Sequence, residues 1–561
     1  MTLPALPAKA GQKTTFGQLV GSSLALVAAR LTREARRPVL LVTADTPSAL
    51  RLEQELGFLL AGQDCPVLLF PDWETLPYDS FSPHQDIISQ RLETLYQLPQ
   101  MRHGVLIVPI STLMLRTAPQ AYLDKYSLMV TSGQRLNLQQ LRGRLAEAGY
   151  VAVEQVLEHG EFAARGSLLD LFPMGSSRPY RIDFFDDEVD SIRPFDPETQ
   201  RSSEPVKSVS LLPAREFPTD EGAIELFRGQ YREQFEISRA EGSVYQEVSK
   251  GRWPAGIEYY LPLFFNQTAS LFDYLPGNTL LLTVGEIYPA AQRFWNDIGQ
   301  RYEDRRWDNT RPLLPPQQIY LPVEQLFAAL GQYAAVRLQE APTAGDAGQH
   351  DLPLSALPDL QLDHSKEQPL LALSQFLQGF AGRTLFAVES EGRREGLGDL
   401  LARINLQPRE FASLDAFLSS DARHGLLVCP LERGFLLQEP GQTPLALITE
   451  AELLGGKIRS KRQRDKNKNL SSDAVIRNLG ELTQGQPVVH LDHGVGRYLG
   501  LETIDAGGLP TEFLTLEYAG GDKLFVPVTS LHLISRYTGS DNPPSHKLGG
   551  EAWVKARRKA A

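Results

Sequence analysis

Short apolar runs alternate with amphipathic stretches over the first part of the chain. Residues 38–43 read PVLLVT, and after a few turn residues the amphipathic ALRLEQELGFLL follows. Residues 106–116, LIVPISTLMLR, repeat the order of an apolar run, a turn and a helical stretch. Buried strands of a parallel sheet read as continuous apolar runs and are joined by crossover helices. The pattern therefore predicts a parallel α/β domain that begins within residues 1–126.

The hydrophobic pattern changes after residue 126. LRGRLAEAGY (141–150) is typical of a helix, while EFAARGSLLDLFP and PYRIDFFDDEVDSIRPFD alternate between charged turns, as short strands do. Amphipathic stretches and the strand-like TLLLTV return further along the chain. We interpret residues 127–212 as a small α+β insertion, and residues 213–340 as the second part of the first domain.

The second half of the chain predicts further domains and linkers. Residues 341–365 are rich in Pro, Gly, Ala and Asp, which is typical of a linker. Strand and helix patterns predict a small α/β domain of unknown role over 366–455, followed by a basic linker over 456–479. We interpret the basic run as solvated, with a nucleic-acid or polymerase contact as the alternative.

The last part of the chain has a different pattern of residue types. β-branched and aromatic residues at short spacing fill residues 480–545 and predict a small, strongly bent antiparallel barrel. Residues 546–561 begin a helix that stops without a capping residue, so we expect more chain to follow. The expected fold class is therefore α/β multi-domain.

Composition narrows the classes of protein to consider. The 561 residues carry a net charge of −12, whereas a protein that grips many DNA phosphates is usually basic. The two cysteines, Cys65 and Cys429, have no ligand-spaced His or Cys beside them. Neither a long apolar run nor a signal-peptide pattern occurs. We expect a cytoplasmic protein without a membrane span or metal, whose partners are mainly proteins.

The stretch GQLVGSSLALVAARL (17–31) has the outline of a phosphate-binding loop before a helix. Such a loop needs a lysine for the phosphate oxygens and a Ser or Thr for Mg²⁺. In Gly21-Ser22-Ser23-Leu24-Ala25 the lysine place holds Leu24 and the Ser/Thr place holds Ala25. We therefore predict a degenerate loop that binds no ATP.

Two arginines and one aromatic residue of the insertion form a candidate binding group. Arg165 and Arg181 lie on strands that we predict to be neighbours, and Phe185 follows four residues after the second. Arg and aromatic residues are enriched at protein-binding hot spots, although surface arginines and a core phenylalanine remain the plainer alternative. The run RIDFFDDE (181–188) imitates a Walker B strand, but without a working phosphate loop we interpret it as a strand before an acidic turn.

The residues suggest no catalytic group. Asp492 and His493 stand together before Gly494, but no nucleophile in a recognisable motif accompanies them. We interpret them as a tight turn between strands. Without a DEAD-type box or a metal-ligand cluster, we predict no catalytic residue and no metal site in these residues.

Four long stretches closely resemble bacterial transcription-repair coupling factors, and the resemblance runs in order from about residue 15 to the end. They are DWETLPYDSFSPHQDIISQRLETLYQL (72–98), EHGEFAARGSLLDLFPMGSSRPYRIDFFDDEVDSIRPFD (158–196), AVESEGRREGLGDLL (387–401) and GQPVVHLDHGVGRYLGLETI (485–504). The resemblance implies that residues 1–126 and 213–340 form a degenerate, UvrB-like helicase domain. It also implies that 127–212 is a UvrA-binding domain, whose contacts fall on Arg165, Arg181 and Phe185.

The resemblance assigns a second partner to residues 480–545. These residues are similar to the Tudor-like (SH3-like) domain that docks on the RNA polymerase β subunit, with the contact on Leu499 beside Arg497 and Tyr498. The family continues into a double-stranded DNA translocase that uses ATP and Mg²⁺, so these cofactors and most DNA contacts are expected outside this chain. We expect a monomeric adaptor; the alternatives are a UvrB-like ATP-dependent helicase and a plain DNA-binding module.

Overall fold

The computed structural model describes most of the chain, in two compact units. The described residues are 3–238, 240–362, 368–454, 485, 487–490, 493–505, 510–518, 521–527 and 534–536. The first unit comprises residues 1–357, 382–395 and 408–447, and the second comprises 358–381, 396–407 and 448–561. The predicted basic linker (456–479) lies outside the described residues, as does the helix expected over 546–561.

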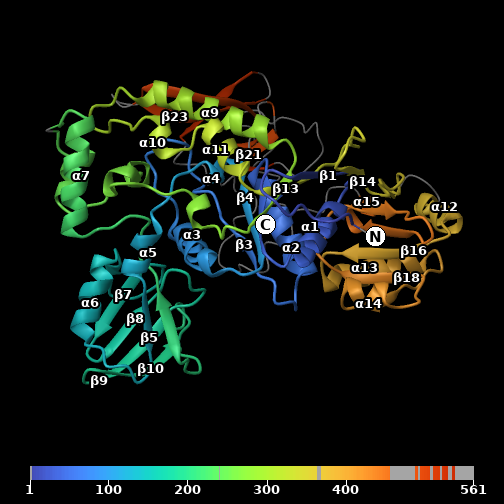
Figure 1. Ribbon diagram of the computed structural model, residues 1–561, viewed down its shortest axis with the longest axis horizontal. Helices are drawn as coiled ribbons and strands as arrows, with labels where there is room; N and C mark the ends of the chain where they lie inside the picture. Colours follow the sequence, from blue (N-terminus) through green and yellow to red (C-terminus); the bar gives the residue numbers. More distant parts are fainter. Residues whose placement is uncertain are drawn as a thin grey trace. The chain divides into compact units, whose positions relative to one another are not determined.

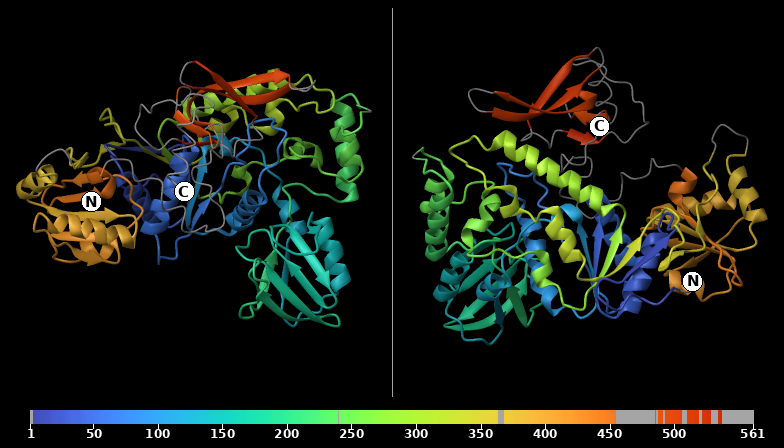
Figure 2. Two further views of the ribbon diagram at one scale, coloured as in Figure 1. Left: turned by 180° about the vertical axis from the view of Figure 1, so that it is seen from behind. Right: turned by 45° about the horizontal axis from the view of Figure 1, so that its top comes forward.

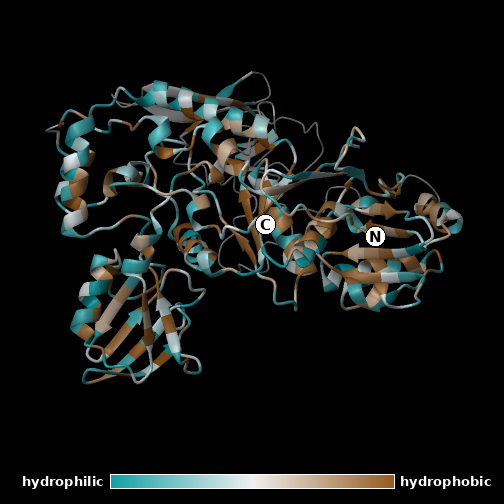
Figure 3. Cartoon of the chain, in the orientation of Figure 1, coloured by the Kyte–Doolittle hydropathy of each residue, from teal (hydrophilic) through white to brown (hydrophobic). Residues whose placement is uncertain are grey.

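A seven-stranded sheet, all of whose pairings are parallel, forms the centre of the first unit, in the order β14-β1-β13-β12-β2-β4-β3. Every residue of β2 and β4 is buried, which explains their continuous apolar sequences (Figure 3). The prediction of a mixed α/β protein with a parallel sheet is confirmed. The strands are β1 (Lys13–Gly17), β2 (Pro38–Thr43), β3 (Val67–Leu69), β4 (Gly104–Pro109), β12 (Leu280–Val284), β13 (Ala334–Leu338) and β14 (Gln349–Asp351).

Helices cover both faces of this sheet (Figure 1). Side chains of α1 and α2 share one buried cluster with Leu41 of β2, while those of α3, α4, α9 and α11 share another with Leu40. Alternate residues of the strand therefore serve the two faces. The helical elements are α1 (Ser23–Ala35), α2 (Thr46–Leu59), α3 (Gln85–Gln97), η1 (Leu98–Gln100), α4 (Ile110–Leu113), α5 (Gln120–Tyr126), α7 (Glu221–Gln234), α8 (Val244–Ser249), η2 (Ile257–Phe264), η3 (Leu271–Tyr274), α9 (Ile287–Arg305), α10 (Pro316–Ile319) and α11 (Val323–Leu330).

The insertion folds as a five-stranded sheet in the order β10-β9-β8-β7-β6, with one helix, α6. A separate ribbon of β5 and β11 joins its two ends. One prediction was wrong: β7 and β9, which carry the two candidate arginines, are not neighbours, because β8 lies between them. The elements are β5 (Leu128–Thr131), α6 (Leu138–Glu147), β6 (Val151–Ala152), β7 (Glu161–Arg165), β8 (Leu168–Leu171), β9 (Tyr180–Phe185), β10 (Glu188–Pro194) and β11 (Ser208–Leu211).

A six-stranded sheet in the order β15-β19-β20-β16-β18-β17 follows. The segment 341–365, predicted to be a linker, contributes two short strands: β14 pairs with β1, and β15 pairs with β19. Composition alone did not indicate these two strands, because the strands with which they pair, β1 and β19, are distant in the sequence. The elements are β15 (Leu354–Ser355), α12 (Leu371–Gly379), β16 (Arg383–Val388), α13 (Glu391–Ala402), β17 (Arg409–Phe411), α14 (Leu414–Leu418), β18 (His424–Val428), β19 (Phe435–Leu437), β20 (Leu445–Thr449) and α15 (Glu450–Leu454).

The last sheet is antiparallel and five-stranded, in the order β24-β23-β22-β21-β25. Among the described residues its first and last strands do not pair, so the predicted closed barrel is not seen as such. The strands are β21 (Pro487–His490), β22 (Gly494–Asp505), β23 (Pro510–Glu517), β24 (Lys523–Pro527) and β25 (Ile534–Arg536). In the parts of the chain that the structure describes, no helix has the length and apolar character needed to cross a bilayer.

Candidate functional site

The strand register places the three predicted UvrA-contact residues on one face of the insertion's sheet. Arg181 lies opposite Asp170, and Asp170 lies opposite Ala163. Residues two apart on a strand share a face, so Arg165 joins Ala163 and Phe185 joins Arg181. Residues of two strands that are not neighbours, β7 and β9, therefore lie on the same face of the sheet.

The opposite face of this sheet is buried against α6. Leu169, Ile182 and Phe184 are buried in the cluster that also holds Leu141 and Leu145 of α6. Figure 2 shows this helix against the sheet. The face that carries Arg165, Arg181 and Phe185 is therefore the face turned away from α6; we call it the arginine face.

Arg181 is held in a fixed position on the arginine face. Its Nε donates to Asp170 Oδ1 at 2.7 Å, and a second guanidinium nitrogen donates to Asp170 Oδ2 at 2.9 Å. Its guanidinium carbon also lies 5.0 Å from the centre of the Phe195 ring. These hydrogen bonds to the Asp170 carboxylate raise the pKa of Arg181. A bidentate pair fixes the plane of the guanidinium, so a partner meets a prearranged group.

Phe185 and Arg165 are more open than Arg181. Phe185 is 75% exposed and ends β9, just before Asp186 takes a positive φ of 53° in the turn to β10. Arg165 is exposed at the end of β7, where its guanidinium donates to the backbone carbonyl of Glu154. An exposed aromatic ring beside two arginines is the composition of a protein-binding hot spot.

A β-bulge in β22 sets the position of Leu499. Tyr498 pairs with Leu516 and Gly500 pairs with Thr515, so Leu499 is the extra residue between them. Its side chain is partly exposed. Bulges re-aim a side chain and bend the strand that carries them.

The neighbours of Leu499 have different roles. Tyr498 is buried, with 6% of its surface exposed, so its ring supports the sheet and does not extend the contact surface as the sequence led us to expect. Arg497 is partly exposed, and its guanidinium donates to the Gly485 carbonyl at 3.0 Å. Of the three predicted polymerase-contact residues, Arg497 and Leu499 are therefore the accessible ones.

Comparison with known families matches three separate segments of the chain. Residues 128–217 match the UvrB interaction domain, and residues 376–453 match the D3 domain of Mfd. Residues 482–538 match the CarD-like/TRCF RID domain. Each of these matches coincides with one of the sheets described above.

Curated relatives match the chain from end to end. The Transcription-repair-coupling factor of Escherichia coli (strain K12) is 51% identical over 559 residues, which is 99% of this chain and 48% of that protein. The chain belongs to the transcription-repair-coupling factors. The coupling factor of Haemophilus influenzae is 48% identical over 561 residues, and that of Bacillus subtilis 28% over 575. The chain spans about half the length of these relatives.

The phosphate-loop region of this coupling-factor chain is closed to solvent. Ser22, Ser23, Leu24 and Ala25 are all buried. The Ser22 hydroxyl donates to Glu55 Oε1 at 2.6 Å, and burial raises the pKa of Glu55. A buried carboxylate where phosphate oxygens would approach makes the loop unfavourable for an anion.

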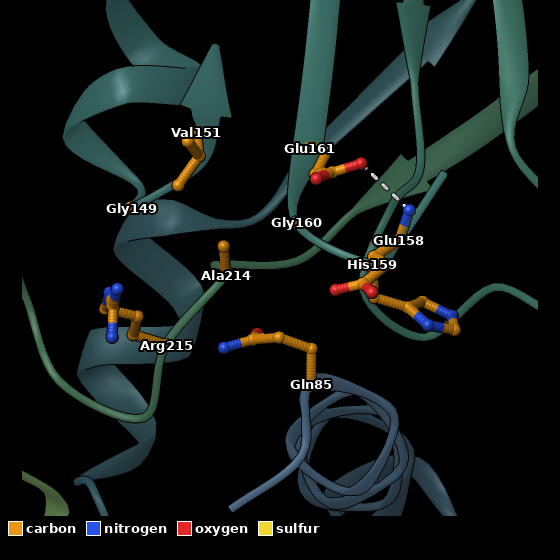
Figure 4. A pocket seen from close by; sticks show the side chains of 9 residues that line it. All are labelled: Gln85, Gly149, Val151, Glu158, His159, Gly160, Glu161, Ala214 and Arg215. Atoms are coloured by element: carbon orange, nitrogen blue, oxygen red, sulfur yellow. Dashed lines mark hydrogen bonds between the residues drawn. The ribbon is translucent and has the colours of Figure 1, made fainter. Parts of the chain in front are cut away.

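The structure also reveals a pocket that the sequence did not indicate, with a volume of about 160 Å³ (Figure 4). Gln85 at the start of α3 projects towards Arg215 and the loop that carries His159. His159 Nδ1 lies 2.7 Å from Asp86 Oδ1, and its Nε2 lies 2.7 Å from the Ser176 carbonyl oxygen. This histidine therefore ties the insertion to α3. No sequence motif could have predicted this contact, because Asp86 and His159 are 73 residues apart.

In the described part of the chain, no group of three or more His, Cys, Asp or Glu side chains is arranged to hold a metal ion.

Proposed function

We propose that this chain is a two-site adaptor of transcription-coupled DNA repair. Its insertion recruits UvrA through Arg165, Arg181 and Phe185, and its last sheet holds the RNA polymerase β subunit through Leu499 and Arg497. The single observation that carries the proposal is the common face of the first three residues, two of which are held by hydrogen bonds. Prearranged arginines beside an exposed aromatic ring bind at low entropic cost.

The activity of the whole coupling factor completes this proposal. Other parts of the full-length protein act as an ATP-dependent translocase on double-stranded DNA, use ATP and Mg²⁺, and displace the stalled polymerase. The match of residues 482–538 to the CarD-like/TRCF RID domain supports the polymerase contact. A Tudor-like closure of the last sheet, a monomeric state and a cytoplasmic location belong to the same proposal.

Charge reversal on the arginine face tests the UvrA site. Arg165→Glu together with Arg181→Glu is expected to reduce UvrA affinity by at least about 100-fold, because two hot-spot contacts become repulsive. Binding to RNA polymerase should stay unchanged. Both affinities are measured by surface plasmon resonance with purified UvrA and core polymerase.

Arg144→Glu is the matched control for the UvrA site. Arg144 is an exposed arginine of the same insertion, but it lies on α6, which packs against the other face of the sheet. Its reversal should leave UvrA binding within about twofold of the unmodified chain. A loss equal to that of the double variant would mean that overall charge, and not the arginine face, binds UvrA.

A substitution at the bulge tests the polymerase site. Leu499→Arg is expected to abolish polymerase binding and to spare UvrA binding, because a charge would replace an apolar contact. Phe525→Arg serves as its control, since Phe525 is an exposed apolar residue of β24 in the same sheet. If the two substitutions weaken polymerase binding equally, Leu499 has no special part in docking.

The rival function is a UvrB-like ATP-dependent helicase. It requires an open phosphate loop, whereas Leu24 occupies the lysine position and is 4% exposed. A titration of the chain with ATP decides between them, and micromolar affinity would favour the helicase. A plain DNA-binding module is the other rival, and a salt-dependent shift with duplex DNA would favour it.

A further inference from the structure

A loop of the six-stranded sheet sits directly on the degenerate phosphate loop. The Ser22 backbone N–H donates to the Arg433 carbonyl at 3.0 Å, and the Arg433 backbone N–H donates to Ser22 Oγ at 3.2 Å. The Glu432 backbone N–H lies 3.4 Å from Glu55 Oε1. Ser22 thus joins the start of α1 to the loop between β18 and β19 by reciprocal hydrogen bonds.

The fit at this contact is close enough to require glycine. Gly21 has a positive φ of 57°, which favours glycine. A Cβ atom on Gly21 would come within 2.6 Å of the Gly434 carbonyl oxygen and 3.0 Å of Arg433 Cβ. The backbone of residues 433–434 therefore fills the space over the turn that a phosphate group would need.

The chemistry of the contact also differs from that of a nucleotide site. A phosphate loop offers its backbone N–H groups and a lysine to an anion. Here the Ser22 N–H already donates to a carbonyl, and the buried side chain beside it is the carboxylate of Glu55. The polar groups are arranged to receive a polypeptide backbone.

Apolar packing continues from this contact into both sheets. Leu24 of α1 belongs to the buried cluster that holds Leu431 and Phe435, on either side of the loop. Residues 382–395 and 408–447 also fall in the same compact unit as residues 1–357. The side chain that replaced the lysine is thus part of a core shared by the two α/β sheets.

We propose that residues 431–434 are a built-in plug of the former phosphate site. The plug joins the six-stranded sheet rigidly to the domain of α1 and α2, and it excludes nucleotide by occupation as well as by the loss of the lysine. This gives the domain predicted over 366–455 a role that the sequence did not supply. The proposal does not depend on the UvrA or polymerase sites.

Hydrogen exchange followed by mass spectrometry tests the plug in the intact chain. Gly21→Ala forces a Cβ atom against Gly434, and it should raise amide exchange at least about tenfold in both segments 18–24 and 431–435, because several buried hydrogen bonds are lost together. Gly62→Ala is the matched control. Gly62 also has a positive φ, of 73°, but nothing lies within 4 Å of its Cβ position.

The buried strand β12 reports on global unfolding in the same experiment. If Gly21→Ala also exposes residues 280–284, the milder Ser22→Ala decides, since it removes only the hydroxyl between Glu55 and Arg433. A rise confined to the two segments in Gly21→Ala supports the plug, as does the same result in Ser22→Ala where Gly21→Ala unfolds the chain. If the deciding variant leaves exchange at 431–435 unchanged, or if Gly62→Ala gives an equal rise, the plug is overturned.

Discussion

At the scale of single residues, the arginines of the arginine face differ in how they are held. Arg181 has a bidentate carboxylate and a ring beneath it, whereas Arg165 bonds a backbone carbonyl at an exposed strand end. Asp170, which is 7% exposed, lies on the same face, but its oxygens are used by Arg181. Asp170 therefore positions the Arg181 guanidinium on the arginine face.

Removing the charge of Asp170 should loosen Arg181 and weaken UvrA binding. We expect Asp170→Asn to raise the Kd for UvrA about fivefold to tenfold, because one orienting ion pair is lost while Arg181 itself remains. The measurement is a UvrA titration by calorimetry. Asp183→Asn, which removes one negative charge from the same face, is the control. Equal effects from both would indicate net charge and not positioning.

Arg165, Arg181 and Phe185 were grouped from strands predicted to be neighbours and from the family resemblance, whereas β8 separates β7 from β9. The sequence did not predict correctly which residues of β22 are exposed. The place of Tyr498 was misjudged, because neighbouring side chains of a strand point to opposite faces, and Tyr498 pairs with the buried Leu516. The bulge at Leu499 depends on the facing strand and leaves no local mark in the sequence.

At the scale of elements, hydrogen bonds join α3 to the insertion at two places: His159 contacts Asp86, and the Gly175 backbone N–H donates to Ser89 Oγ at 2.8 Å. The hydrogen bond from His159 lowers the pKa of Asp86, the second residue of α3. A carboxylate with a lowered pKa in the folded state stabilises the fold above its unfolded pKa of about 3.9. That contribution is lost as the pH falls through the lowered folded value.

The stability difference between the unmodified chain and Asp86→Ala should therefore depend on pH. We expect the variant to unfold at lower urea at pH 7, and the gap between the two midpoints to close towards about pH 3. Urea unfolding followed by tryptophan fluorescence at both pH values checks this. Asp124→Ala, at an exposed carboxylate of α5, should show no such gap. A gap that persists unchanged in acid would contradict a role for the Asp86 carboxylate.

At the scale of the whole molecule, the sequence predicted the buried strands better than it predicted the contacts between segments that are distant in the chain. Continuous apolar runs marked β2 and β4, because both of their faces are covered. The short strands β14 and β15 were missed, since each is stabilised by a partner far away in the chain. The contact of Ser22 with Arg433 was also not predicted, because the two residues are 411 positions apart in the sequence.

The ribbon of β5 and β11 determines how the insertion is attached to the parallel domain. Leu128 at the start of the insertion pairs with Leu211 at its end, so the chain leaves and re-enters the parallel domain at adjacent positions. Paired residues on antiparallel strands lie only about 5 Å apart, and a segment with such ends closes on itself. The insertion is therefore attached to the parallel domain at two neighbouring points, so a change in its length need not displace the strands of the parallel sheet.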